Sequence, residues 1–185
     1  TFYSGTVDEQ DRVFTGGYTG PFRDALGVRI EEFAPVATET VVHLSDGSDA
    51  RLWSERGRAT TAQVIASFTG GAADGSPAIT RNSWGDGTAW YLATLPNADA
   101  YRDLMARIVA EAELAPPAAV IGDLRALELV RRRSTDQSYL FIVNHGAAEV
   151  TVEATGVDLV ASTAVSGHVV VPAGAVRIIR EESIA

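Results

Sequence analysis

Two adjacent prolines, Pro116 and Pro117, place the strongest constraint on how this chain of 185 residues can fold. Proline has no backbone N–H to donate and disfavours helix at the residue before it, so regular structure is interrupted there. The stretch before the pair contains the clearest helical pattern in the sequence, and the stretch after it has strand patterns only. We therefore predict two domains, residues 1–117 and residues 118–185.

The clearest helix is predicted over residues 97–114. Asn97 is a suitable N-cap, because its side chain can accept a hydrogen bond from an unpaired amide of the first turn. Apolar residues recur at helical spacing, and we expect the face that they form to pack on a sheet. These residues are Tyr101, Leu104, Met105, Ile108, Val109 and Ala112. A short helix is also predicted over residues 22–26, between Pro21 and Gly27.

Short runs rich in β-branched and aromatic residues predict strands in both domains. In the first domain, the predicted strands are residues 28–33, 38–45, 50–58, 61–68, 78–84 and 88–95. Asp46-Gly47 and Asp86-Gly87 supply tight turns, so we expect antiparallel hairpins. In the second domain, the predicted strands are residues 124–132, 138–145, 149–154, 158–162, 168–172 and 176–181. This series of short strands predicts a small antiparallel β-sandwich.

Composition argues against several classes of function. The formal net charge of −9 disfavours nucleic acid and anionic membranes as partners, because both would be repelled. Cysteine is absent, which excludes disulfides and a cysteine nucleophile. No apolar run approaches the roughly 20 residues that span a bilayer, and no signal peptide is recognisable, so we expect a cytoplasmic protein. The chain opens without Met on strand-like residues, which indicates the interior of a longer polypeptide.

No metal or cofactor motif is complete. His43, His145 and His168 lie on separate predicted strands without a ligand partner nearby in sequence, so we expect no metal site. Residues 85–90, GDGTAW, lack the third glycine and the following helix of a dinucleotide-binding loop, so we interpret them as a turn and expect no cofactor. A serine nucleophile is unsupported, because the chain has no G-x-S-x-G elbow.

Paired carboxylates are the strongest remaining catalytic signal, because glycosidases use two acids that flank the scissile bond. Glu31-Glu32 and Glu181-Glu182 are each adjacent on a predicted strand, so the members of each pair should point to opposite faces. Asp8, Glu9 and Asp11 fall in a loop and are interpreted as solvated charges. Residue chemistry alone therefore reveals no active site.

Two further features receive structural interpretations. Arg131-Arg132-Arg133 is interpreted as a solvated strand end and not as a nucleic-acid site. Trp53, Trp84 and Trp90 could stack on sugar rings, but Trp84 and Trp90 flank a predicted hairpin and are expected to pack across it.

Several ungapped segments resemble a single family. Residues 2–33, FYSGTVDEQDRVFTGGYTGPFRDALGVRIEEF, closely resemble the middle domain of bacterial β-galactosidases of glycoside hydrolase family 42, which carries SGxVDExDRV followed by GGYPGPLRDxLGxRVEEF. The agreement continues through residues 52–55 (LWSE), residues 75–94 and the helix that follows. Residues 140–145, LFIVNH, match an element of the family's small C-terminal β domain. The resemblance runs in order along essentially the whole chain.

The resemblance implies a fold for each domain. Family members have an N-terminal TIM barrel, a middle domain with an amidotransferase-like fold that mediates trimer formation, and a small β domain. We therefore expect an α+β or α/β chain. Its first domain should be a partial amidotransferase-like (flavodoxin-like) domain with hairpins and one long helix, lacking its first strands. An antiparallel β-sandwich should follow.

The resemblance also implies a function at two levels. The parent protein is expected to hydrolyse terminal β-galactosides with retention, through a covalent galactosyl intermediate. Both catalytic glutamates of the family lie in the barrel, so this chain should contain no catalytic residue, and the absence of cysteine excludes amidotransferase activity. The chain itself is expected to be a non-catalytic C-terminal fragment that forms a homotrimer through its middle domain, with the barrel of the same polypeptide as its other partner.

The loop that opens the chain contains the predicted contact residues. We expect Phe14, Tyr18, Phe22 and Arg23 to lie at an interface between subunits or domains, because aromatic residues and Arg anchor such surfaces. Two alternatives stay open: the loop lines a shared entrance to the active sites, or Phe22 and Leu26 cap the local core. Two other functions also stay open, a stand-alone carbohydrate-binding module and a free-standing enzyme with an acid pair in this loop.

Overall fold

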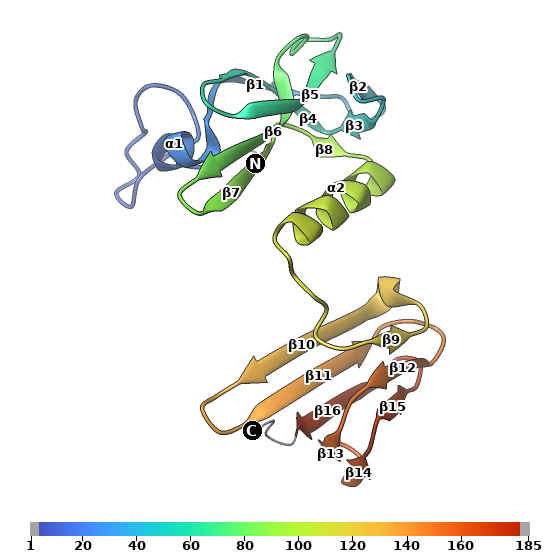
Figure 1. The fold of residues 1–185 in the computed structure, drawn as a ribbon. Helices are drawn as coiled ribbons and strands as arrows, with labels where there is room; N and C mark the ends of the chain where they lie inside the picture. The colour runs from blue at the N-terminus through green and yellow to red at the C-terminus, as the bar shows by residue number, and fades with distance from the viewer. Residues whose placement is uncertain (1–3, 182–185) are drawn as a thin grey trace. The chain divides into compact units, whose positions relative to one another are not determined.

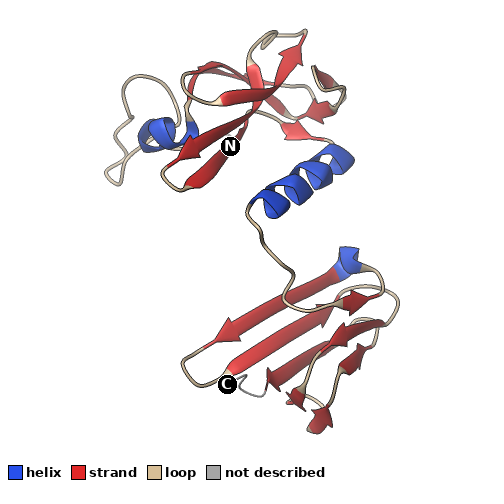
Figure 2. Ribbon diagram, viewed as in Figure 1, coloured by secondary structure: helices blue, strands red, loops and turns tan. Residues whose placement is uncertain are grey.

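The computed structural model describes residues 4–181 and divides into two compact units between Ala110 and Glu111 (Figure 1). Both units consist mainly of short strands, with few helices (Figure 2). Within residues 4–181, every pairing between strands is antiparallel. No helix in this range is long and apolar enough to cross a membrane.

The first unit combines one sheet with a separate two-stranded ribbon. Its strands are β1 (Val28–Pro35), β2 (Val42–Leu44), β3 (Asp49–Arg51), β4 (Trp53–Ala59), β5 (Gln63–Thr69), β6 (Pro77–Trp84), β7 (Gly87–Leu92) and β8 (Leu95–Pro96). Six of them form a sheet in the order β7-β6-β5-β2-β3-β8, and β1 pairs with β4 to form the ribbon. Both predicted hairpins are present, with Gly47 in the β2–β3 turn and with Gly85 and Asp86 between β6 and β7.

The single strand predicted over residues 50–58 is wrong. Leu52 has a φ of 73°, a conformation that cannot continue a strand. The chain therefore leaves the six-stranded sheet at Arg51 and enters the ribbon at Trp53, while the Leu52 carbonyl accepts a hydrogen bond from the Val36 amide at 3.0 Å. Leucine rarely adopts a positive φ, so the sequence contains no signal for this break.

The helices begin and end close to the predicted positions. A 3-10 turn, η1 (Gly20–Phe22), leads into α1 (Arg23–Leu26), and Gly27 ends it with a φ of 64°. The long helix is α2 (Ala98–Glu111), and the Asn97 side chain accepts a hydrogen bond from the Ala100 amide at 2.9 Å, which confirms the predicted N-cap.

The predicted core face of α2 is too wide. Leu104 is buried, and Met105 and Ile108 pack against the core of the first unit. Tyr101 and Val109 are 42% and 45% exposed, and Ala112 is also exposed. These three residues therefore lie outside the core, although they fall within the predicted stripe. The core itself joins ribbon, sheet and helix, and its buried members include Val28, Ile30, Leu44, Phe68, Ile79, Tyr91 and Leu104.

The second unit is the predicted antiparallel sandwich. Its elements are β9 (Val120–Ile121), η2 (Leu124–Ala126), β10 (Leu127–Arg133), β11 (Ser138–Asn144), β12 (Val150–Glu153), β13 (Gly156–Asp158), β14 (Thr163–Val165), β15 (His168–Val171) and β16 (Val176–Glu181). One sheet has the order β10-β11-β16-β13-β14 and the other has the order β15-β12-β9. Leu140, Ile142 and Ile179 from the first sheet share a buried core with Val152 and Val171 from the second.

The strand predicted over residues 158–162 is wrong beyond its first residue. The Asp158 carboxylate accepts hydrogen bonds from the amides of Val160 and Ala161, which turns the chain directly after β13. Ser162 follows with a φ of 56°, and only then does β14 begin. A local carboxylate–backbone interaction has replaced ladder hydrogen bonds here.

Candidate functional site

The acidic cluster of the opening loop builds a turn. The Asp8 carboxylate accepts hydrogen bonds from the amides of Gln10 and Arg12 at 2.9 and 3.0 Å, and pairs with the Arg12 guanidinium at 3.0 Å. The bond from the Arg12 amide is the main cause that holds the pKa of Asp8 below its usual value. Val7 and Val13 close this turn as an antiparallel bridge. Asp8 therefore stabilises the loop and shows no pairing with a second acid.

Arg23 closes the glycine-rich part of the same loop from α1. Its Nη2 donates to the carbonyl oxygens of Thr15 and Gly17, both at 3.1 Å. A Cβ on Gly16 would lie 3.2 Å from the guanidinium, so the absence of a side chain there leaves room for this contact. The predicted interface cation is thus held inside its own loop.

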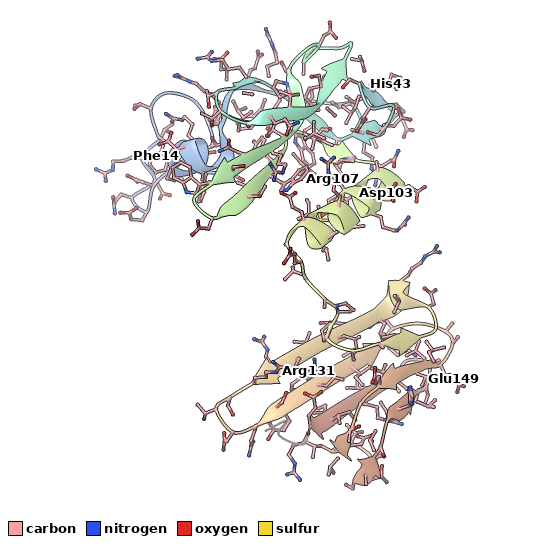
Figure 3. The ribbon with its side chains drawn as sticks, viewed as in Figure 1. Phe14, His43, Asp103, Arg107, Arg131 and Glu149 are labelled. Atoms are coloured by element: carbon pink, nitrogen blue, oxygen red, sulfur yellow. The ribbon has the colours of Figure 1, made fainter. Side chains whose placement is uncertain are left out.

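Two of the three aromatic residues that were predicted as contact residues pack within the first unit. The Tyr18 ring lies 4.2 Å from the Phe33 ring, centroid to centroid, and the Tyr18 amide donates to the Ile30 carbonyl at 2.8 Å. Phe14, labelled in Figure 3, packs against Gly20. A Cβ added to Gly20 would lie only 2.7 Å from the Phe14 ring. Both side chains are half-buried.

Phe22 is the member of the predicted set that faces solvent, with 52% of its surface exposed. Two apolar residues that the sequence reasoning did not single out accompany it on the loop: Val13 is 66% exposed and Val7 is 44% exposed. We call Val7, Val13 and Phe22 the loop patch. The sequence did contain a signal for this exposed surface. Val7 and Val13 lie on either side of the acidic turn, and apolar residues are unusual in so polar a segment.

A second cluster that sequence reasoning missed lies inside the first unit. Glu55, on β4, is fully buried, and its Oε2 accepts a hydrogen bond of 2.6 Å from the hydroxyl of Tyr91 on β7. Burial raises the pKa of Glu55 to about 7, although the hydrogen bond from Tyr91 opposes this rise. The only signal in the sequence was that Glu55 lies two residues after Trp53, on the same face of a strand.

The acidic pair on β1, Glu31 and Glu32, forms ion pairs. A β-bulge at Glu31 corrects the expectation that Glu31 and Glu32 point to opposite faces, because they pair with Arg58 and Arg56 respectively, two alternate residues on one face of β4. Both pairs are exposed, so these carboxylates are neutralised locally and do not form a catalytic acid pair.

A half-buried ion pair in the second unit corrects the interpretation of Arg131 as part of a solvated strand end. Arg131 donates to Glu181 in bidentate geometry, with Nε–Oε2 at 2.9 Å and Nη2–Oε1 at 2.7 Å, and Ser138 donates to Oε2. Burial opposes ionisation, but the hydrogen bonds from Arg131 and Ser138 hold the pKa of Glu181 below its usual value. The pair lines a hollow of about 830 Å³, and its charges are satisfied by each other. Glu182 lies outside the described residues.

The tryptophans do not pack across their hairpin as predicted. Trp84 lies opposite Gly87 and Trp90 lies opposite Arg81, which places the two indoles on opposite faces of the β6–β7 hairpin. Trp84 is 56% exposed, whereas Trp90 packs against the core below the Arg107 guanidinium, 5.2 Å from its ring.

The histidines do not meet in the structure. His43, labelled on β2 in Figure 3, contacts Asp49 at 2.8 Å, and His145 lies 3.4 Å from Glu128. Among residues 4–181, no group of three or more His, Cys, Asp or Glu side chains could hold a metal ion.

Comparison with known proteins decides the family. Residues 1–115 match the model of the β-galactosidase trimerisation domain, and residues 126–181 match that of the β-galactosidase C-terminal domain. The chain belongs to the β-galactosidases of glycoside hydrolase family 42. Two β-galactosidases of Arthrobacter sp. are 41% and 43% identical over 98% and 95% of the chain. LacZ of Heyndrickxia coagulans is 36% identical over 84% of it.

The chain spans about a quarter of the length of these family 42 relatives, 26% and 25% for the Arthrobacter proteins. Among solved structures, the β-galactosidase from Bacillus circulans sp. alkalophilus is 30% identical, with a TM-score of 0.77 over 97% of this chain and 28% of its own. Gan42B, a β-galactosidase of the same family from G. stearothermophilus, shares the fold with a TM-score of 0.76 at 20% identity. The predicted resemblance is therefore confirmed, and the trimerisation-domain match supports self-association.

Proposed function

We propose that this chain is the non-catalytic assembly part of a bacterial β-galactosidase and holds subunits together as a homotrimer. The match of residues 1–115 to a trimerisation domain carries the proposal. We assign the hydrolysis of terminal β-galactosides to a TIM barrel, in the part of the longer relatives that this chain does not match. Two glutamates of that barrel would carry out the reaction with retention. The barrel would be the partner of this chain within one polypeptide. This division is supported by five acids that are engaged in a turn, an ion pair or the core: Asp8, Glu31, Glu32, Glu55 and Glu181.

The opening loop is the proposed contact surface. Phe14, Tyr18 and Arg23 hold its shape through the contacts described above, and the loop patch presents apolar surface from this rigid support. Exposed apolar side chains on an ordered loop are the features that mark contact sites on soluble proteins. We therefore assign direct contact to Phe22 and Val13, and support to the other predicted residues.

The test of this surface is the double variant Val13→Ser/Phe22→Ser. Sedimentation velocity should show a trimer for the wild-type chain and a smaller species for the variant, while circular dichroism stays unchanged, because both side chains are largely exposed. Val160→Ser, at a 53% exposed position of the second unit, is the matched control and should leave the trimer intact. A double variant that sediments like wild type would show that the loop patch is not the contact surface.

Two structural proposals accompany this function. We place the functional boundary at Pro116-Pro117, with residues 1–117 as the assembly domain and residues 118–185 as the C-terminal domain. We also propose that the amidotransferase-like (flavodoxin-like) arrangement belongs to the complete middle domain of the longer protein. Its parallel strands would lie in sequence that this chain does not contain, since the pairings between residues 4 and 181 are antiparallel.

A carbohydrate-binding role is the second candidate, and the exposed Trp84 favours it. An indole that is 56% exposed could stack on a sugar ring. Titration of the chain with galactose or lactose, followed by tryptophan fluorescence, should give a saturable change that Trp84→Ala removes if this role is real. A flat titration would leave assembly as the function.

A further inference from the structure

The buried Glu55–Tyr91 contact joins the ribbon to the sheet. Glu55 lies on β4, in the ribbon, and Tyr91 lies on β7, in the six-stranded sheet. Thr80 lies directly opposite Tyr91 in the β6–β7 ladder. Within residues 4–181, Oε1 of Glu55 and Oγ1 of Thr80 are buried without a hydrogen-bond partner. The carboxyl therefore has one donor for two oxygens, which is too few to stabilise a buried negative charge.

No described cation compensates for this charge. The residue opposite Glu55 on β1 is Phe33, and β6 and β7 contribute Thr80 and the phenol of Tyr91. Arg56 and Arg58, on the same strand, pair with Glu32 and Glu31 on the exposed face of the ribbon. Burial and the nearby carboxylate raise the pKa of Tyr91, so the phenol stays neutral.

We propose that protonated Glu55 is a latch that holds the β1–β4 ribbon, and with it the opening loop, in the conformation that associates. The neutral carboxyl still accepts the hydrogen bond from Tyr91 and carries no charge, whereas the carboxylate is a buried charge with a single hydrogen-bond donor. Deprotonation transfers the proton to solvent and favours movement of β4 away from the sheet. The final step, from ribbon to association, rests on the proposed function.

Contacts connect the latch to the opening loop. Glu55 lies opposite Phe33 in the ribbon, and Phe33 contacts the Tyr18 ring of the loop. The Tyr18 amide is bonded to β1 at Ile30. At the other end of the ribbon, the amide of Thr60, directly after β4, donates to the Gly27 carbonyl at the end of α1 at 2.8 Å. Displacement of β4 would therefore disturb both attachments of the loop.

The direction of the pH effect follows from linkage. The carboxyl has a pKa of about 7 in the folded chain, whereas the usual pKa of a glutamate is 4.5, so the folded chain binds the proton more tightly than the unfolded chain. The contribution of Glu55 to the free energy of unfolding is therefore greatest below pH 4.5. This contribution falls as the pH rises from 4.5 to about 7, and it is constant above that. Association should weaken over the same interval.

The experiment compares the full chain with Glu55→Gln at pH 5.5 and pH 8, by sedimentation and by thermal unfolding followed through tryptophan fluorescence. At pH 8, the wild-type chain should associate several-fold more weakly than at pH 5.5, and it should unfold at a lower temperature. Glu55→Gln, which is neutral at both pH values, should lose most of this difference. Glu39→Gln, at an exposed position, is the matched control and should keep it.

The outcomes separate the latch from the proposed function. Equal pH dependence of unfolding in the wild type and Glu55→Gln would overturn the latch. A Glu55-dependent unfolding difference without association at either pH would support the latch and overturn the assembly role. If Glu55→Gln does not fold, carbon-13 NMR of the glutamate carboxyls in the wild-type chain decides. A carboxyl that titrates above pH 6 supports the latch, and the lack of such a carboxyl overturns it.

Discussion

At the scale of single residues, Arg23 is the side chain on which the shape of the opening loop depends. A guanidinium presents several N–H groups in one plane, so Nη2 can bond two carbonyls, those of Thr15 and Gly17, at once. A lysine ammonium also has several N–H groups, but its side chain is shorter and would not place them at the Nη2 position. The loop patch lies on either side of the residues that Arg23 holds, so loss of these hydrogen bonds should be felt there first.

Arg23→Lys should therefore loosen the loop without unfolding the chain. We expect faster amide hydrogen exchange across residues 13–22 and a loss of about 1 kcal/mol in the free energy of unfolding, the usual value of one hydrogen bond. Arg12→Lys is the control, because the Arg12 side chain is 73% exposed and its ion pair should contribute little. Equal effects of the two substitutions would show that Arg23 has no special role.

Residue types in this loop were predictable from sequence, but side-chain directions were not. Phe14, Tyr18 and Phe22 are all aromatic residues near glycines, yet only Phe22 faces solvent. The difference arises from tertiary contacts, the Phe33 ring for Tyr18 and the close approach of Gly20 for Phe14. Glu55 was missed for the same reason, since its burial depends on Tyr91, 36 positions away in sequence.

At the scale of secondary structure, short-range signals predicted what local interactions determine. The Asn97 cap, the Gly27 stop and the glycine turns of both hairpins depend on neighbours within a few residues. The break at Leu52 and the turn after Asp158 depend on backbone conformations that the sequence does not signal. Element boundaries therefore failed where local strain or a side-chain cap interrupted a strand.

The cap of α2 offers a direct test at this scale. Asn97→Ala removes the side-chain acceptor for the Ala100 amide and should lower the free energy of unfolding by about 1 kcal/mol. Asn97→Asp keeps an acceptor at the helix N-terminus and should be nearly neutral. Denaturant unfolding followed by circular dichroism measures both variants. An alanine variant as stable as wild type would show that α2 is held by the packing of its apolar face and not by its cap.

At the scale of the whole molecule, each of the two compact units has its own core. The first core joins β1, β5, β6, β7 and α2, and the second joins the two sheets of the sandwich. The domain boundary at Pro116-Pro117 stays a prediction, because it rests on the proline pair and the change of pattern after it. The antiparallel sheet order of the first unit was not predictable, because pairing between distant strands is decided by packing and not by local pattern.

Separate cores predict separate unfolding. Ile142 is fully buried in the second core, and Ile142→Ala should destabilise the sandwich by about 2–5 kcal/mol. All three tryptophans, Trp53, Trp84 and Trp90, lie in the first unit, so their fluorescence reports on that unit alone. The fluorescence transition should stay in place while part of the circular dichroism transition moves to lower denaturant.

Ile30→Ala is the reciprocal change, because Ile30 is 3% exposed in the first core. It should move the fluorescence transition and, by loosening β1 beside the Tyr18 attachment of the loop, also weaken association. Ile142→Ala should leave association unchanged, since the proposed contact surface belongs to the first unit. If Ile142→Ala moved both transitions together, the two cores would form one cooperative structure, and the assignment of assembly to the first unit alone would be wrong.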